Sequence, residues 1–258
     1  MRHICTLSGG KASAFCADYA IKKYGKENIV LYFNDTGWEH PDLFRFLEDL
    51  SNYWGLPIVN DSDGRNPEEV FYDQNMLGNN RVPLCSRILK AERLQKYFKD
   101  GDNLIFGIGP EEKHRAIRLV QVYQIVAVKR QQFCTLEFPL IENQVTKEQV
   151  QDWIDSTGIE IPVLYRLGFD HNNCSGGCVR AGKKHWAHLL SVLPDVYKDR
   201  ERVEEEFRAY SGKDVHFFKD ETLKHYRERI EAKDQTAFDF SPEDSVAVEC
   251  IGICNLEN

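Results

Sequence analysis

Residues 7–13, Leu-Ser-Gly-Gly-Lys-Ala-Ser, combine residue types that together could bind a phosphate group. Glycine lets the backbone approach an oxyanion, and a helix N-terminus directs free N–H groups at it. The segment differs from a Walker loop, which has four residues between its first glycine and Gly-Lys. An ordinary strand-to-helix turn is the alternative. The residues predicted to contact phosphate are Ser8, Gly9, Gly10, Lys11 and Ser13.

A second polar turn follows the next apolar run of the chain. Residues 29–33 read as a buried strand and end in Asn34-Asp35-Thr36-Gly37. Asp35 could bind ribose hydroxyls or a metal ion, and Gly37 lets the turn pass close to a nucleotide. The alternative is a turn that caps the following helix. Because ligands of open α/β sheets bind outside the carboxyl ends of the strands, we expect both turns on one edge.

The elements that must position these turns alternate along the chain. Apolar runs and helical patterns predict an α/β fold with a doubly wound, mostly parallel sheet. We expect a nucleotide-binding domain over residues 1–180 and a helical C-terminal extension over 181–258, with charged helical stretches at 183–208 and 221–231. The predicted strands are 3–7, 29–33, 56–60, 103–107 and 133–137, and the predicted helices are 12–24, 41–54, 86–99, 112–129 and 147–157.

Composition sets limits on the partners of this chain. Its 258 residues are 42% hydrophobic, enough for a substantial core, and the net charge of −8 argues against a broad nucleic-acid surface. With neither a signal-peptide pattern nor a membrane-spanning run, we expect a cytoplasmic protein, while a homo-oligomer stays open. One local group of basic residues could still bind nucleic acid or form a solvated helix face: Lys113, His114, Arg115, Arg118, Lys129 and Arg130.

The eight cysteines fall into two kinds. Cys5, Cys16 and Cys134 lie in strand-like or helix-like apolar surroundings and are predicted to be core residues. Two Cys-x-x-x-Cys pairs, Cys174 with Cys178 and Cys250 with Cys254, lie in glycine-containing turns. Such pairs suit zinc or an iron-sulfur cluster, although idle thiols are the alternative.

Several segments, which follow one another in the same order along the chain, resemble the phosphoadenosine phosphosulfate reductase family. This family lies within the PP-loop adenine nucleotide alpha hydrolase-like superfamily. The resemblance implies a Rossmann-like fold and an enzyme that binds an adenine nucleotide or adenylyl sulfate. The resembling segments are 8–13, 35–42, 85–90, 107–115, 138–141, 150–154 and 161–169. The nucleotide-binding residues so predicted are Ser8, Gly9, Gly10, Lys11, Ser13, Asn34, Asp35, Thr36, Gly37, Arg87, Lys90, Gly107 and Arg115.

The resemblance also implies sulfur chemistry at cysteine. In the adenylyl-sulfate reductase branch, cysteines at positions like Cys85, Cys174 and Cys178 hold a four-iron four-sulfur cluster. Leu84 stands where that branch has a further cysteine, so Cys250 or Cys254 would supply the fourth ligand. The tail around Cys250 also resembles the family's nucleophilic cysteine segment, so Cys250 is either nucleophile or ligand. The implied reaction is thiol-dependent reduction of adenylyl sulfate, with a reductant such as thioredoxin; Cys250, Lys11 and Asp35 are the predicted catalytic residues.

Ala12 departs from the pattern of PP-loop enzymes that cleave ATP, which resemble Ser-Gly-Gly-x-Asp-Ser. Magnesium, a further candidate cofactor, would need other oxygen ligands, such as Asp35. Two other function classes stay open. One is an ATP-dependent sulfur-insertion enzyme that acts on nucleic acid, as in phage or defence-associated relatives. The other is a non-catalytic nucleotide-binding subunit with a structural zinc.

Overall fold

A central sheet of five parallel strands organises the chain. The structure is a computed structural model that describes residues 1–79 and 81–233. The strands are β1 (His3–Leu7), β2 (Ile29–Asp35), β3 (Ile58–Ser62), β4 (Asp102–Phe106) and β5 (Cys134–Glu137). Their order, β3-β2-β1-β4-β5, reverses direction at β1, which pairs with both β2 and β4. The predicted α/β class and doubly wound sheet are confirmed. A crevice is expected at the carboxyl ends of β1 and β4, where the strand order reverses.

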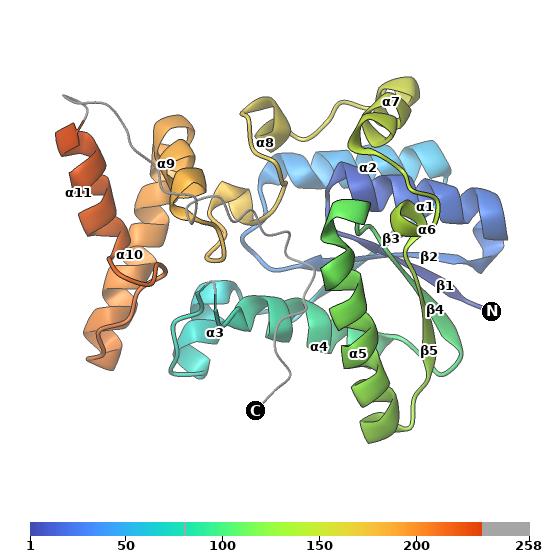
Figure 1. The fold of residues 1–258 in the computed structure, drawn as a ribbon, viewed down its shortest axis with the longest axis horizontal. Coiled ribbons are helices and arrows are strands. Elements are labelled where there is room, and N and C mark those ends of the chain that lie inside the picture. The colour runs from blue at the N-terminus through green and yellow to red at the C-terminus, as the bar shows by residue number, and fades with distance from the viewer. Residues whose placement is uncertain (80, 234–258) are drawn as a thin grey trace.

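Alternate residues of each strand enter two different cores, one on each face of the sheet. Cys5 and Leu7 of β1 pack under α1 (Lys11–Tyr24), α2 (Pro41–Trp54) and α7 (Lys147–Thr157). Ile4 packs on the opposite face with residues of α4 (Glu92–Tyr97) and α5 (Lys113–Arg130). Figure 1 shows these two helical layers with the sheet between them. This period-two alternation is what a strand buried on both faces requires.

A third core lies beside the sheet and contains the C-terminal helices. It is formed by α3 (Pro67–Asp73), α9 (Lys183–Val192), α10 (Pro194–Ser211) and α11 (Leu223–Lys233) (Figure 1). The helix predicted over 183–208 is in fact two helices, because Pro194 cannot continue α9 and instead begins α10. Glu204 of α10 is fully buried and accepts hydrogen bonds from the backbone N–H groups of Phe217 and Leu223, both at 2.6 Å.

The remaining elements are short. They are 3-10 turns at Lys26–Asn28, Pro110–Glu112 and Cys174–Gly176, helices α6 (Pro139–Glu142) and α8 (Val163–Arg166), and a π-helix at Ser86–Ala91. The helix predicted over 86–99 therefore changes type: the N–H of Glu92 bonds to the carbonyl of Arg87, five residues back, before α4 continues. Cys5 and Cys16 are buried as predicted, whereas Cys134 is half-buried at the edge strand. Among the described helices, none is long and apolar enough to cross a membrane.

Candidate functional site

The predicted phosphate-binding turn joins β1 to the N-terminus of α1. Gly9 has φ +77°, a conformation that side-chain-bearing residues rarely adopt, and Gly10 is the N-cap. The Ser13 hydroxyl accepts from the Ser8 backbone N–H at 3.0 Å and donates to the Gly10 carbonyl at 3.0 Å, which fixes the turn. Gly10 has no side chain to cap α1, so the first N–H groups of this helix lie beside the turn, where an anion could accept from them.

Two cavities flank this helix N-terminus. The first measures about 50 Å³ and is lined by Ser8, Ser13, Asn34, Lys90 and Gly107, together with Thr6, Tyr32 and Tyr123. The second measures about 710 Å³ and is lined by Lys11, Gly107, Gln151, Tyr165 and His171, among others. Nucleotide-sized ligands need several hundred cubic ångströms. Of these two cavities, the second has the volume that a nucleotide-sized ligand needs.

Lys11 lies in the second cavity, across the helix N-terminus from the side lined by Ser8 and Ser13. Its ammonium donates to Gln151 Oε1 at 2.6 Å and lies 4.6 Å from the centroid of the Tyr165 ring. The Tyr165 hydroxyl in turn accepts from the Lys11 backbone N–H at 3.4 Å. Burial lowers the pKa of Lys11. Gln151 and Tyr165 belong to segments that the sequence singled out, but neither was assigned a role there.

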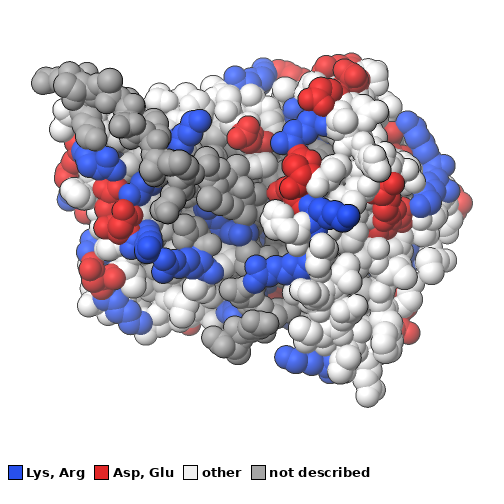
Figure 2. Space-filling view, in the orientation of Figure 1, with Lys and Arg blue, Asp and Glu red and all other residues white. Residues whose placement is uncertain are grey.

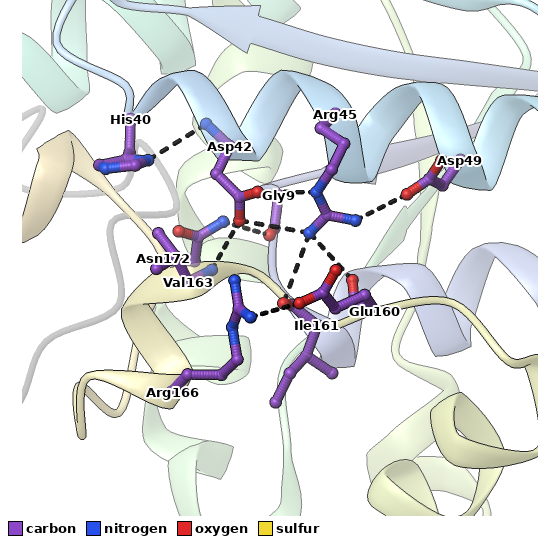
Figure 3. A network of polar contacts seen from close by, with 10 residues as sticks. All are labelled: Gly9, His40, Asp42, Arg45, Asp49, Glu160, Ile161, Val163, Arg166 and Asn172. Carbon is purple, nitrogen blue, oxygen red and sulfur yellow. Dashed lines mark hydrogen bonds and ion pairs between the residues drawn. The ribbon is translucent and has the colours of Figure 1, made fainter.

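The second turn closes on itself rather than capping the next helix. Asp35 Oδ1 accepts from the Gly37 backbone N–H at 2.8 Å, and Gly37 has φ +74°. His40 is the N-cap of α2, because its Nδ1 accepts from the Asp42 N–H at 3.1 Å (Figure 3). The capping role considered for the Asp-Thr-Gly turn is therefore wrong, while a ribose or metal role for Asp35 stays a prediction.

A polar network holds α8, and with it Tyr165, against the start of α2. Asp42 Oδ2 accepts from the Val163 N–H at 2.6 Å, and Arg45 binds both Asp42 and the carbonyl of Glu160 (Figure 3). The Arg45 guanidinium holds the pKa of Asp42 below its usual range. This network positions the ring that covers Lys11.

The predicted cationic residues divide into two groups. Lys90 lines the first cavity, and its ammonium lies 3.4 Å from Oε1 of Glu39, whose side chain is 1% exposed. Arg87 and Arg115 instead pair with Glu92 and Glu112 of their own segments. The structure therefore brings Lys90, and not the two arginines, to the cavity edge.

Three of the predicted metal ligands share the third core. Cys85, Cys174 and Cys178 are all buried there. Within residues 1–79 and 81–233, however, no group of three or more His, Cys, Asp or Glu side chains is arranged to hold a metal ion. Cys250 and Cys254 lie outside the described residues. The described cysteines alone thus do not form a metal centre, and the metal remains a prediction.

A buried arginine adjoins the cysteine loop. Arg200 of α10 is 5% exposed, and its guanidinium carbon lies 3.5 Å from the centroid of the Trp38 ring. Its Nε has no hydrogen-bond partner among the described residues, and burial lowers its pKa. Nearby, a Cβ added at Gly177 would lie 3.0 Å from this Nε. The same guanidinium pairs through Nη1 with Asp199, so only its Nε remains a buried donor without a partner among the described residues.

Comparison with protein families decides the identity of this fold. A family model, the phosphoadenosine phosphosulfate reductase domain, matches residues 2–181. The chain belongs to the phosphoadenosine phosphosulfate reductase family. No curated protein and no solved structure matches it. This family consists of enzymes of sulfur metabolism that bind adenine or sulfated nucleotides. The matched range contains both turns, the residues that line the two cavities, and three predicted cysteine ligands.

Side chains that join distant segments of this reductase-family domain were not found from the sequence. Asn172 donates from Nδ2 to the Gly9 carbonyl at 2.8 Å, and Glu39 Oε2 accepts from the Cys174 N–H at 3.0 Å. Asn172 lies outside the segments that the sequence analysis used for binding, and Glu39 lies within segment 35–42 but was assigned no role there. No local signal marks them, because each contact spans more than 100 residues of chain.

Proposed function

We propose that this phosphoadenosine phosphosulfate reductase family member binds adenylyl sulfate across the N-terminus of α1 and reduces its sulfo group with thiols. The observation that carries the proposal is the helix N-terminus of α1 between two cavities, with Lys11 on one side and Lys90 on the other. Helix N–H groups and two ammonium groups suit the phosphate and sulfate oxygens of such a substrate. Asp35 is the last residue of β2, on the same edge, where it would accept from ribose hydroxyls.

The reaction follows from that placement in two thiol steps. A cysteine thiolate, for which Cys250 is the candidate, attacks the sulfur of the sulfo group, and the bond from sulfur to the phosphate oxygen breaks. AMP leaves with that electron pair, and the sulfo group stays on the cysteine. A thiolate of an external dithiol reductant such as thioredoxin then attacks the cysteine sulfur. Sulfite leaves, and a disulfide forms between the reductant and the cysteine. Lys11 and Lys90 would offset the charge that develops on the leaving phosphate.

Nucleotide binding is the first test. We expect Lys11→Ala and Lys90→Ala each to weaken adenylyl sulfate and AMP binding by about 10-fold to 100-fold, because each removes a charge-assisted hydrogen bond. Isothermal titration calorimetry measures the two affinities. Lys96→Ala is the matched control, since Lys96 is exposed on α4 and lines neither cavity. Equal affinities in all four proteins would contradict the proposed site, and a sulfite assay with added thioredoxin then tests turnover.

The cofactor is the second test. We propose that Cys85, Cys174 and Cys178, with Cys250 or Cys254, hold a four-iron four-sulfur cluster or zinc. Thiolate ligands of this kind suit either group. Cys174→Ser and Cys178→Ser should each lower the metal content at least fivefold in anaerobically purified protein, measured as iron, zinc and sulfide per chain. Cys134→Ser, on β5, should keep the wild-type content. Unchanged metal in both loop variants would rule out the ligand assignment.

One observation favours sulfur insertion into nucleic acid as a second candidate function. Helix α5 contains no acidic residue, and Lys113, Arg118 and Lys129 are exposed on it. Exposed Ile117 and Val128 interrupt this basic surface, however, and Figure 2 shows acidic and basic groups intermingled on the visible face. We therefore rank this function second. Consumption of ATP that rises with added nucleic acid, without turnover of adenylyl sulfate, would favour it.

A further inference from the structure

The cysteine loop, residues 172–178, is attached by side chains to both nucleotide-facing turns. Asn172 Nδ2 donates to the Gly9 carbonyl at 2.8 Å, within the first turn. The Ser175 hydroxyl donates to the Trp38 carbonyl at 3.0 Å, directly after the second turn. The Cys174 N–H donates to Glu39 Oε2 at 3.0 Å. The loop therefore has contacts to both turns that are predicted to touch a nucleotide.

The backbone of this loop needs such support. Cys174, Ser175 and Gly176 have successive φ angles of +50°, +53° and +82°. Left-handed conformations are unfavourable for residues with a Cβ, and they persist only where the surroundings impose them. The contacts from the two turns are thus part of what keeps the loop in this form.

Glu39 occupies the junction between loop and cavity. Its carboxylate is 1% exposed and accepts from the Thr36 hydroxyl at 2.9 Å in addition to the Cys174 N–H. Its third neighbour is the Lys90 ammonium, which also lines the first cavity. An anionic nucleotide would compete with Glu39 for Lys90, and it would order Thr36 in the second turn. A change at Thr36 or Lys90 therefore reaches Cys174 through one carboxylate, while the first turn reaches the loop through Asn172.

We propose that Glu39 is a positioning residue through which nucleotide occupancy sets the conformation of the cysteine loop. This rests on the proposed nucleotide site. Binding orders the turns at Gly9 and Thr36, and the loop is ordered with them through Asn172 and Glu39. By thermodynamic linkage, a loop held in this conformation strengthens nucleotide binding by the same factor. The sulfur chemistry at the cysteines is thereby coupled to an occupied nucleotide site.

Hydrogen–deuterium exchange of the full-length protein, with and without AMP, tests this coupling. We expect AMP to slow exchange at least fivefold in peptides that cover residues 172–177 as well as residues 8–13. In Glu39→Gln the slowing at 172–177 should fall below twofold while that at 8–13 persists, because one amide oxygen cannot replace both carboxylate oxygens. Glu48→Gln is the matched control, since Glu48 is exposed on α2, the helix that follows Glu39, and it should behave as wild type.

Each other outcome has a definite meaning. Slowing at 8–13 without slowing at 172–177 in the wild type would overturn the coupling and leave the nucleotide site standing. An unaltered response in Glu39→Gln would overturn the role of Glu39. If calorimetry shows no AMP binding to the wild type, both the site and the coupling are wrong. Should Glu39→Gln fail to fold, Asn172→Ala tests the same coupling through the other contact, and it should at least halve the response at 172–177.

Discussion

Gly107→Ala should remove detectable nucleotide binding and lower the free energy of unfolding by about 3 kcal/mol. Gly107 follows β4 and lines both cavities. A Cβ at this position would lie 2.6 Å from both Cα and N of Ser13, and 2.9 Å from the carbonyl carbon of Ala12. These are backbone atoms in the first turn of α1, so relief requires the helix to move away from the sheet. The phosphate-binding N–H groups would move with it.

Chemical denaturation and calorimetry with AMP measure the two effects of this substitution. Gly109→Ala is the matched control, because its Cβ would meet chiefly the flexible carboxylate end of Glu111. We expect that control to lose less than about 1 kcal/mol. Wild-type stability and affinity in Gly107→Ala would show that α1 does not pack on β4 as closely as described.

Glu204 should make the stability of the protein depend on pH, and its replacement should remove that dependence. Burial raises the pKa of Glu204 to about 7, and the N–H groups of Phe217 and Leu223 offset this only in part. A carboxyl group whose pKa is higher in the folded than in the unfolded chain stabilises the fold at low pH. That contribution is lost as pH rises through 7. The wild type should therefore lose about 2–3 kcal/mol relative to Glu204→Gln between pH 5 and pH 8.

Urea denaturation of both proteins at the two pH values gives this difference directly. Glu206→Gln is the control, since Glu206 is an exposed residue of the same helix and should follow the wild type at both pH values. A constant difference between wild type and Glu204→Gln would mean that Glu204 does not titrate in this range. Glu204→Ala should cost more than Glu204→Gln at pH 5, because it leaves two buried N–H groups without an acceptor.

The strands and the two polar turns could be predicted because their signals are local. Apolar runs of four to seven residues between helical patterns mark a parallel sheet, and glycines such as Gly9 and Gly37 mark the turns that follow β1 and β2. The charged stretch over 183–208 was predicted as helical, and it is helical, but the prediction did not include the break at Pro194. Proline lacks the N–H donor that would continue α9.

The side-chain contacts of the site could not be predicted in the same way. Lys11 binds Gln151, which is 140 residues away, and Asn172 binds Gly9 across 163 residues. Such contacts depend on how α7, α8 and the cysteine loop pack against the sheet edge, and no spacing in the sequence encodes that packing. The cysteine ligand set stays a prediction, because its last members, Cys250 and Cys254, lie outside the described residues.

The π-helix at Ser86–Ala91 connects Cys85 of the third core with Lys90, which lines the first cavity. In a π-helix each backbone N–H bonds to the carbonyl five residues back, so Cys85 and Lys90 are separated by one hydrogen-bonded turn. In an α-helix they would be about 140° apart around the axis. With one residue deleted between them, the two would be four residues apart in an α-helix and about 40° apart around the axis, so Lys90 should keep its side relative to Cys85. One extra residue in this helical turn thus sets the sequence separation between Lys90, which lines the first cavity, and Cys85 in the third core.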